Sequence, residues 1–412
     1  MRRHSARSVI GATIGGIGGS LPERPEVEAT PVNPGPNGPT ATGGVVHMFP
    51  GQGDFSLTPL LRALPRVPSL ARAVTQVFEE ADTVAAEFGV LPIGPRLTGG
   101  GLPPNAAGPR LSTGVLAGEA PGTVQLALFG VSVAVHRALE ADGLRADRLL
   151  AVSFGEIPAL TAAGSCPIVD GARLSCRLGQ LLTAAGGGMT LLGAAEHRAR
   201  RLLAEAGPAA GSVVVAGVNH AEETVVSGSP AGLAAVETSA GRQGVAAQRL
   251  RLPFMSHHPA LAREAGAFAH YARGLRLEPP RRPVYSAVAG RSYQQDTDLP
   301  RALSACLVRA FALPAVLGPA LAGASQVVEA GTGRTLTNSV RLLTPDVEAL
   351  APVFDGAWPV REPGPPPPPS PWPPTDPPGR PASDPPGQGD PRARPWRTAA
   401  DTHRTTAAER ES

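Results

Sequence analysis

A serine between a predicted strand and a predicted helix is the first residue in this sequence whose surroundings suggest chemistry. Ser153 stands in "LLAVSFGEIPAL", with the small residue Ala151 two positions before it and Gly155 two positions after it. Small residues on both sides let a strand and a helix pack closely around a sharp turn, which lifts the serine hydroxyl above the sheet as a nucleophile. The following helix would offer free N–H groups and a positive dipole end to a developing oxyanion. The simpler interpretation is that Ser153 only caps that helix, because serine is a common N-cap residue.

A glycine-rich turn about a hundred residues earlier is the second such stretch. It reads "VVHMFPGQGDF" over residues 45–55, with glycines on both sides of Gln52. A plain connection needs one glycine at most. Glycine adopts backbone conformations that other residues cannot, so we expect this backbone to approach a packed neighbour or a ligand closely.

The elements around both stretches alternate between strands and helices. The sequence predicts strands over residues 45–49, 147–153 and 325–331, and helices over 124–143 and 155–164. Such alternation favours a parallel sheet that helices cover on both faces.

A separate block between residues 188 and 252 has a different order of elements. It contains four short predicted strands and two predicted helices in the order β-α-β-β-α-β, which is typical of ferredoxin-like folds. We therefore predict an α/β protein with a hydrolase-like parallel sheet domain over residues 45–187 and 253–352. A ferredoxin-like α+β subdomain, residues 188–252, is inserted into it.

Composition excludes several other classes of protein. Residues 1–44 and 355–412 are rich in Gly and Pro, and we predict a disordered leader and a disordered tail there. The net charge is only +3 and no basic stripe occurs, so we expect no nucleic-acid partner. The sequence contains no run of eighteen apolar residues, so we expect no membrane span. The odd number of cysteines, 3, predicts neither a disulfide framework nor a metal site, and a cytoplasmic location is the default.

Five motifs follow one another with natural spacing, and as a set they are far more specific than any one of them. They read "VHMFPGQG", "SFGEIPALTAAG", "VVVAGVNHAEETVVSG", "LPFMSHHPAL" and "VVEAGTGRTL". The series resembles the family of malonyl-CoA:acyl carrier protein transacylases and polyketide synthase acyltransferase domains, over roughly residues 45–350. The chain would be a stand-alone and divergent member.

The resemblance implies a role for both the serine turn and the glycine-rich turn. Ser153 would be the nucleophile, and the backbone N–H groups of Gln52 and Phe154 would form the oxyanion hole. The base falls in "SHHP", where His257 aligns with the family's histidine and His258 is the rival candidate.

The resemblance also implies how the base is oriented and where the acyl group binds. In the family a backbone carbonyl orients the histidine, and the equivalent segment, "FALPAVLG", places that carbonyl near Val316. Gln125 matches a glutamine near the family's site, although it could equally be a polar residue at the start of a helix. Malonyl-type members carry an arginine that pairs with the substrate carboxylate. Without a gap that position falls on Leu178, whereas Arg177 lies one residue earlier, about 100° around the helix.

Two further departures concern the walls of the predicted pocket. The family's G-H-S at the elbow is here Ala151-Val152-Ser153, and Phe154 follows the serine. The four residues that end at His257 read "FMSH", and Phe254 and Ser256 among them are substrate-binding candidates. Both changes predict a pocket that is more apolar than the malonyl-type norm.

The expected activity is transfer of an acyl group in polyketide or fatty-acid biosynthesis. The group would pass from an acyl-CoA or acyl-carrier thioester, through acyl-Ser153, to the phosphopantetheine thiol of an acyl carrier protein, with no bound cofactor. With Arg177 as a clamp the group would be malonyl-type. Without a clamp it would be a monocarboxylic acyl or aminoacyl group, because burying an unpaired carboxylate is costly.

Two alternatives to the transferase remain at this point. One is a thioester hydrolase that clears stalled acyl chains from carriers, because water could replace the accepting thiol at the same residues. The other is a non-catalytic scaffold that binds a carrier, against which Ser153 and His257 argue.

Overall fold

A parallel sheet places the two chemically suggestive turns side by side. The computed structural model describes residues 43–99 and 111–359, so most of the predicted leader and of the predicted tail lies outside the described residues. The strand order is β11-β10-β1-β2-β7-β8, and only the last pair is antiparallel. The strands are β1 (Gly44–Phe49), β2 (Arg148–Ala151), β7 (Val284–Ser286), β8 (Arg291–Ser292), β10 (Ala324–Glu329) and β11 (Glu348–Leu350). Because Phe49 pairs with Ala151, the turns after β1 and β2 leave the sheet at the same edge. The predicted parallel sheet is confirmed.

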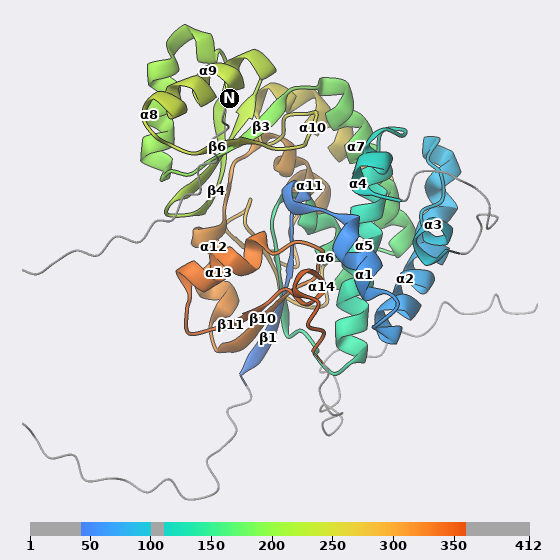
Figure 1. Cartoon of the computed structure of the whole chain (residues 1–412). Coiled ribbons are helices and arrows are strands. Elements are labelled where there is room, and N and C mark those ends of the chain that lie inside the picture. Colours follow the sequence, from blue (N-terminus) through green and yellow to red (C-terminus); the bar gives the residue numbers. More distant parts are fainter. Residues whose placement is uncertain (1–42, 100–110, 360–412) are drawn as a thin grey trace, which may run out of the picture. The chain divides into compact units, whose positions relative to one another are not determined.

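Alternation along β1 divides the core of this sheet into two layers. Successive side chains of a strand point to opposite faces. Val45 and Phe49 pack into a cluster with helix α5, whereas Val46 and Met48 pack into another with helix α12. Figure 1 shows α12 and α13 on one side of β1 and β10, and α5 on the other. Helices thus cover both faces, and only the carboxyl edge of the strands is left for a site.

The helices that cover the parallel sheet have the following bounds. On the α5 side they are α1 (Leu57–Ala63), α2 (Pro68–Ala81), α5 (Thr123–Ala141), α6 (Glu156–Ala162), α7 (Ile168–Ala185), α10 (Ala262–Arg273) and α11 (Leu299–Val308). On the other side they are α12 (Leu313–Leu321) and α13 (Thr335–Leu343). Short helices complete the chain: α3 (Gly94–Thr98), α4 (Thr113–Ala117) and α14 (Pro352–Asp355).

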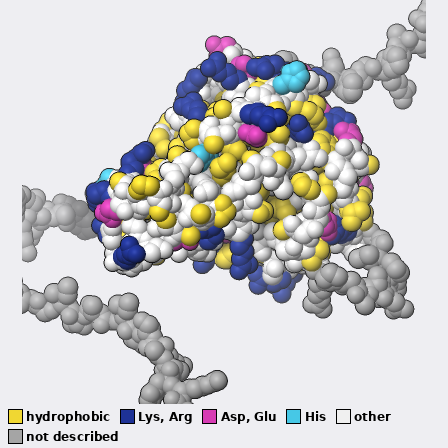
Figure 2. All heavy atoms as spheres, turned by 90° about the horizontal axis from the view of Figure 1, so that it is seen from above, with side chains coloured by type: hydrophobic (Ala, Val, Ile, Leu, Met, Phe, Trp, Pro, Cys, Tyr) yellow, Lys and Arg dark blue, Asp and Glu magenta, His cyan; other side chains and the backbone are white. Residues whose placement is uncertain are grey.

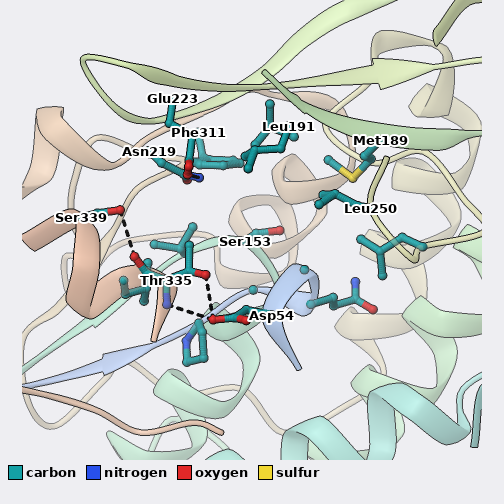
Figure 3. Close-up of a pocket in the computed structure, with 18 of the residues that line it drawn as sticks. Asp54, Ser153, Met189, Leu191, Asn219, Glu223, Leu250, Phe311, Thr335 and Ser339 are labelled. Carbon is teal, nitrogen blue, oxygen red and sulfur yellow. Dashed lines mark hydrogen bonds between the residues drawn. The ribbon is translucent and has the colours of Figure 1, made fainter. Parts of the chain in front are cut away.

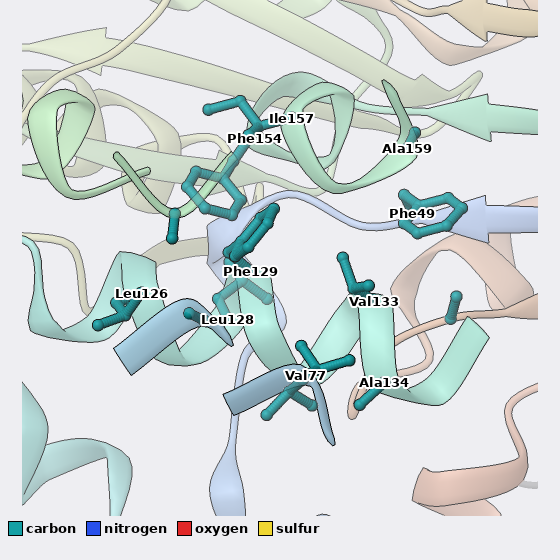
Figure 4. Packing of buried hydrophobic residues seen from close by; sticks show 14 of the residues in the cluster. Phe49, Val77, Leu126, Leu128, Phe129, Val133, Ala134, Phe154, Ile157 and Ala159 are labelled. Atoms are coloured by element: carbon teal, nitrogen blue, oxygen red, sulfur yellow. The ribbon is translucent and has the colours of Figure 1, made fainter. Parts of the chain in front are cut away.

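Helix α5 is the one described helix that is long and apolar enough to cross a membrane. Of its most apolar stretch of 18 residues, 78% is buried inside the structure. Buried residues occur on every side of α5, and Figure 4 shows Phe129 and Val133 of this helix packed among side chains of neighbouring elements. We therefore interpret α5 as a core helix.

A second, mainly antiparallel sheet follows α7. Its strand order is β6-β3-β5-β4-β9, with β3 (Gly188–Leu192), β4 (Val214–His220), β5 (Glu223–Gly228), β6 (Ala247–Arg249) and β9 (Phe311–Ala312). Helices α8 (Glu196–Ala206) and α9 (Pro230–Arg242) complete the predicted β-α-β-β-α-β order, although β6 is shorter than predicted. One face of the sheet packs on α8 and α9 through Leu192 and Val226. The other face joins the α12 layer through Met189 and Val225.

The face of the molecule on which α8 and α9 lie carries charges of both signs among hydrophobic side chains (Figure 2). Figure 2 shows arginines at several separate places on this face, with acidic side chains among them. On α8, Arg200 pairs with Glu196 one helical turn earlier. The charges of this face thus do not gather into one basic stripe.

Candidate active site

Ser153 occupies a strained turn directly after β2. Its φ is 58°, and among the described residues other than glycine only His257, with φ 55°, shares a positive φ. Such backbone is costly and concentrates at functional sites. A Cβ on Gly155 would lie 2.1 Å from the carbonyl oxygen of Phe49, so the turn needs glycine there in order to pack against β1. The turn that begins at Ser153 has Val152 as its N-cap and α6 has Gly155, whereas Ser153 Oγ is directed to a histidine, which argues against the simple N-cap interpretation.

A histidine 104 residues further along the chain meets this serine. Ser153 Oγ lies 2.7 Å from His257 Nε2, and His257 Nδ1 lies 2.7 Å from the carbonyl oxygen of Arg309. A carbonyl only accepts hydrogen bonds, so Nδ1 carries the proton and Nε2 is left to accept one from the serine. Burial lowers the pKa of His257 to about 4. The imidazole is therefore neutral at neutral pH, which is the form that can act as a general base.

The carbonyl that orients this histidine is that of Arg309, so the prediction of Val316 is wrong. Val316 lies inside α12, where carbonyl groups are committed to the hydrogen bonds of the helix. Arg309 follows the last turn of α11 in an extended conformation, and its carbonyl is free to face the imidazole.

The end of α11 also holds the residues on either side of the base. His258 N donates to Leu307 O at 2.8 Å, and Ser256 Oγ lies 3.4 Å from Cys306 O. The ring of His258 is turned to another partner, because its Nε2 lies 2.6 Å from Ser212 O. The structure thus brings His257, and not His258, to Ser153.

The glycine-rich turn after β1 lies against the serine elbow. A Cβ on Gly51 would lie 3.4 Å from Val152 O and 3.5 Å from Ser153 Cβ, which is ordinary van der Waals contact, so the turn packs on the elbow without requiring glycine at this position. Gln52 Oε1 accepts a hydrogen bond from Gln125 Nε2 at 2.7 Å. Gln125 is buried and therefore supports the turn from the α5 side, while Gln52 and Ser153 both line a pocket.

An aspartate at the end of this turn anchors it to α13. Asp54 Oδ2 accepts hydrogen bonds from Arg334 N at 2.8 Å, Thr335 N at 2.9 Å and Thr335 Oγ1 at 2.7 Å. A Cβ on Gly333 would lie 2.2 Å from the same oxygen. The glycine of "AGTGRTL" therefore leaves room for the contact, and the turn is held from both sides.

The pocket lies between the two sheets and has a volume of about 220 Å³. Figure 3 shows Ser153 within it, with Met189, Leu191 and Leu250 at one side and Asn219 and Glu223 nearby. The apolar lining residues are Pro50, Val152, Met189, Leu191, Val225, Leu250, Leu252, Phe254, Phe311 and Leu336. The polar ones include Asn219, His220, Glu223, Thr335, Asn338 and Ser339. Apolar and polar side chains thus both line the pocket.

Two of the predicted wall residues do not face this pocket. The side chain of Phe154 is 1% exposed and packs into the core near Phe129 and Ile157 (Figure 4). The prediction that it makes the pocket apolar is therefore wrong, because the residue after the elbow already faces the core. Ser256 is buried against the end of α11 and does not line the pocket, whereas Phe254 does.

Neither candidate for a carboxylate clamp reaches the pocket. Leu178 is buried in the core around α5. Arg177 is half-buried, with its guanidinium carbon 5.9 Å from the ring centre of Tyr271 and Nη1 3.4 Å from Gln180 Oε1. No arginine occurs among the described residues that line the pocket.

A buried carboxyl group lies next to the elbow and was not among the residues predicted for the site. Glu156 is fully buried and accepts hydrogen bonds from Ser286 Oγ at 2.5 Å and from the hydroxyl of Tyr293. Burial raises its pKa, and these hydrogen bonds oppose the rise. Glu156 thereby ties the helix after the elbow to β7 and β8. Its signal was a charged residue directly after Gly155 in an apolar stretch.

The fold and the site together define a class of protein before any comparison. A serine on an elbow at the carboxyl edge of a parallel sheet, bonded to a buried neutral histidine, is the arrangement of covalent serine catalysis. Residues 48–342 match the family described as acyl transferase domain. The chain belongs to this family.

Curated relatives are much larger proteins. The chain is 32% identical over 255 residues to erythronolide synthase EryA3 of Saccharopolyspora erythraea, which covers 61% of the chain and 7% of that protein. It is 30% identical over 226 residues to mycoketide-CoA synthase of Mycobacterium tuberculosis, which covers 54% of the chain and 5% of that protein. The chain therefore spans less than a tenth of the length of these relatives.

Solved structures of single acyltransferases match over most of the described residues. A malonyl-CoA:acyl carrier protein transacylase from Xanthomonas oryzae pv. oryzae is 27% identical with a TM-score of 0.64, covering 76% of the chain and 97% of that structure. The acyltransferase domain from the second module of the salinomycin polyketide synthase is 28% identical with a TM-score of 0.59, covering 75% of the chain and 68% of that structure. Both share the mixed α/β fold.

Proposed function

We propose that the chain moves an acyl group from an acyl-CoA or acyl-carrier thioester to the phosphopantetheine thiol of an acyl carrier protein, in polyketide or fatty-acid biosynthesis. The observation that carries the proposal is the 2.7 Å contact between Ser153 Oγ and His257 Nε2 at the wall of a pocket. Support for the carrier partner comes from the similar structure, which is that of a malonyl-CoA:acyl carrier protein transacylase.

The proposed chemistry has two half-reactions that share one set of residues. His257 Nε2 takes the proton of Ser153 Oγ, which attacks the thioester carbonyl and forms a tetrahedral intermediate. The intermediate collapses to acyl-Ser153, and the leaving thiol receives the proton from His257. The carrier thiol then gives its proton to His257 and attacks the carbonyl of acyl-Ser153, which forms a second tetrahedral intermediate. This intermediate collapses by breaking the bond between the acyl carbon and Ser153 Oγ, His257 returns the proton to Oγ, and the acyl group leaves as the thioester of the carrier.

The oxyanion of each intermediate would be held by backbone N–H groups of Gln52 and Phe154. Supporting this, the turn that carries Gln52 lies against the elbow and is anchored by Asp54 and Gln125. Loss of one such donor costs roughly 3–4 kcal/mol of transition-state stabilisation.

We further propose that the parallel sheet is a hydrolase-like core, residues 45–187 and 253–352, and that residues 188–252 are an inserted ferredoxin-like subdomain. In support, β3, β4, β5 and β6 pair antiparallel in the order β6-β3-β5-β4. The role of the insertion would be to roof the pocket, to which β3, β4 and β5 contribute side chains.

The transferred acyl group, in this proposal, lacks a free carboxylate. Leu178 is buried in the core and Arg177 stacks near Tyr271, so neither offers a guanidinium to the pocket. A carboxylate that entered the described pocket would lack a cationic partner, which is costly.

Intact-protein mass spectrometry tests the proposal. The purified protein is incubated with malonyl-, methylmalonyl-, acetyl- and longer acyl-CoA donors, with Ser153→Ala as the control. We expect an adduct from monocarboxylic donors that is absent in the variant and passes to an added carrier protein. An adduct from malonyl-CoA alone would overturn the substrate class, and rapid release of free acid without carrier acylation would identify a hydrolase.

A further inference from the structure

The hairpin of β4 and β5 carries a carboxylate that the proposed mechanism does not use. Glu223 is the first residue of β5, lines the pocket, and has a side chain that is 24% exposed. Figure 3 shows Glu223 and Asn219 on one side of Ser153, with Asp54 on the other. The carboxylate therefore borders the space that a substrate must enter in order to reach the nucleophile.

A β-bulge fixes the position of this carboxylate. The pairing of β4 with β5 shifts between Val218 and His220, which leaves Asn219 outside the regular register. Bulges redirect side chains and are common next to active sites. Asn219 is 7% exposed, and its Nδ2 donates to Glu223 Oε1 at 2.7 Å. A buried amide thus holds the carboxylate in one orientation.

The negative charge of Glu223 has no arginine partner within the described residues. Its nearest basic group is His220, whose Nε2 lies 3.9 Å from Glu223 Oε2, beyond hydrogen-bond distance. His220 Nδ1 accepts from Glu222 N at 3.3 Å. The other carboxylate that lines the pocket, Asp54, already accepts three hydrogen bonds through Oδ2. In Glu223, by contrast, the hydrogen bond from Asn219 goes to Oε1, so Oε2 keeps its capacity to accept a hydrogen bond from a ligand.

We propose that Glu223, oriented by Asn219, binds the thioester substrate by accepting a hydrogen bond from an N–H group of that substrate. The inference rests on the proposed function, because it takes the pocket to be the thioester site. The N–H group has two possible sources, an amide of the pantetheine arm or an amino group on the acyl chain. The same charge disfavours acyl groups with a free carboxylate, because like charges repel strongly in a pocket of low dielectric constant.

Propionyl- and 3-aminopropionyl-CoA, which are of similar size, separate the two sources of the N–H group, and malonyl-CoA tests the exclusion of a free carboxylate. The rate of Ser153 acylation is measured by quenched intact-protein mass spectrometry for the wild type, Glu223→Gln and the matched control Glu222→Gln. Glu222 is exposed, precedes Glu223 in the same hairpin and does not line the pocket. The propionyl and 3-aminopropionyl thioesters of N-acetylcysteamine, which keep only one of the two pantetheine amides, complete the set.

Each source of the N–H group gives a different pattern in Glu223→Gln. With an amino group on the acyl chain, only 3-aminopropionyl transfer falls, by roughly tenfold to a hundredfold, the range for a hydrogen bond to a charged group. With a pantetheine amide, propionyl- and 3-aminopropionyl-CoA lose the same factor. If Glu223 binds the amide nearer the sulfur, which N-acetylcysteamine retains, transfer from the N-acetylcysteamine thioesters falls by the same factor. If it binds the amide farther from the sulfur, transfer from these thioesters is unchanged.

Two results would overturn the inference. One is acylation within twofold of the wild type for every donor in Glu223→Gln, and the other is an equal effect of Glu222→Gln. Thermal unfolding of both variants shows whether they are folded. Calorimetric binding of propionyl- and 3-aminopropionyl-CoA to Ser153→Ala, with and without Glu223→Gln, needs no turnover. It therefore tests the carboxylate even if acyl transfer itself fails.

Discussion

Removal of the Asp54 carboxylate should weaken both the fold and the acylation of Ser153. Asp54 closes the glycine-rich turn, and its Oδ2 accepts three hydrogen bonds from Arg334 and Thr335 at the start of α13. We expect Asp54→Ala to release the turn from α13. Since Gly51 of the same turn packs on Ser153, the proposed N–H donor of Gln52 would lose its fixed position.

The magnitude follows from the three contacts. Losing a side-chain cap costs about 1 kcal/mol, and a favourable charge at a helix N-terminus adds about 0.3–1 kcal/mol. Arg334 is exposed and Thr335 half-buried, so water can replace part of what is lost. We therefore expect Asp54→Ala to lower the free energy of unfolding by about 2 kcal/mol. A displacement of about 1 Å at the donor can slow acylation by about a hundredfold.

The assay combines denaturant unfolding with the rate of adduct formation from propionyl-CoA. Asp54→Asn keeps an oxygen acceptor without the charge and should lie between the wild type and Asp54→Ala. Gly333→Ala attacks the same contact from α13, because its Cβ would lie 2.2 Å from Asp54 Oδ2, and should reproduce both effects. Asp346→Ala, at an exposed site before β11, is the control.

Two outcomes would refute the reasoning. Full acylation rate in a destabilised Asp54→Ala would show that α13 does not position the turn for catalysis. Unchanged unfolding in Asp54→Ala would show that the three hydrogen bonds do not anchor it.

Three other predictions concern titration and the missing clamp. Because the pKa of His257 is lowered to about 4, the acylation rate should stay constant from pH 7 to about 5 and fall below about 4, whereas a pH–rate profile with a limb near 6.5 would contradict this. His47 and His136, whose Nδ1 atoms lie 2.8 Å apart, both have a pKa lowered by burial to about 3. Between about pH 3 and 6.5 the unfolded state therefore binds more protons than the folded state. Urea unfolding should show full stability above pH 6.5 and a loss of up to ~1.4 kcal/mol per histidine for each pH unit below it. Replacing both histidines by leucine should flatten this dependence on pH. Leu178→Arg should destabilise the fold and fail to yield a malonyl adduct, because the side chain faces the core; a folded variant that accepts malonyl-CoA would show that the position reaches the pocket.

Local sequence signals were sufficient for the elements and for the serine turn, whereas the resemblance to a family supplied the histidine. The strand over residues 45–49 alternates between two apolar layers, and the structure buries both of its faces. Small residues around Ser153 predicted the sharp turn, and a Cβ on Gly155 would indeed collide with β1. These signals work because strand periodicity and the close approach of glycine depend on residues a few positions apart.

Tertiary packing alone decided the partners and directions of the remaining groups. The acceptor for His257 is the backbone of Arg309, and a backbone carbonyl leaves no side-chain signature that an alignment can locate. Phe154, Leu178 and Arg177 follow plausible patterns, yet the packing around α5 and α7 turns all three away from the pocket.

The sequence by itself thus determined the class of fold and singled out the serine and the histidine that meet in the pocket. The tertiary structure decided which carbonyl faces that histidine and which side chains line the pocket, down to Glu223, which a bulge in β4 presents to it. The physical reason is that residue types and local spacing encode what a segment can do. The direction of a side chain or carbonyl depends on neighbours that are tens or hundreds of residues away, and it exists only after the chain has packed.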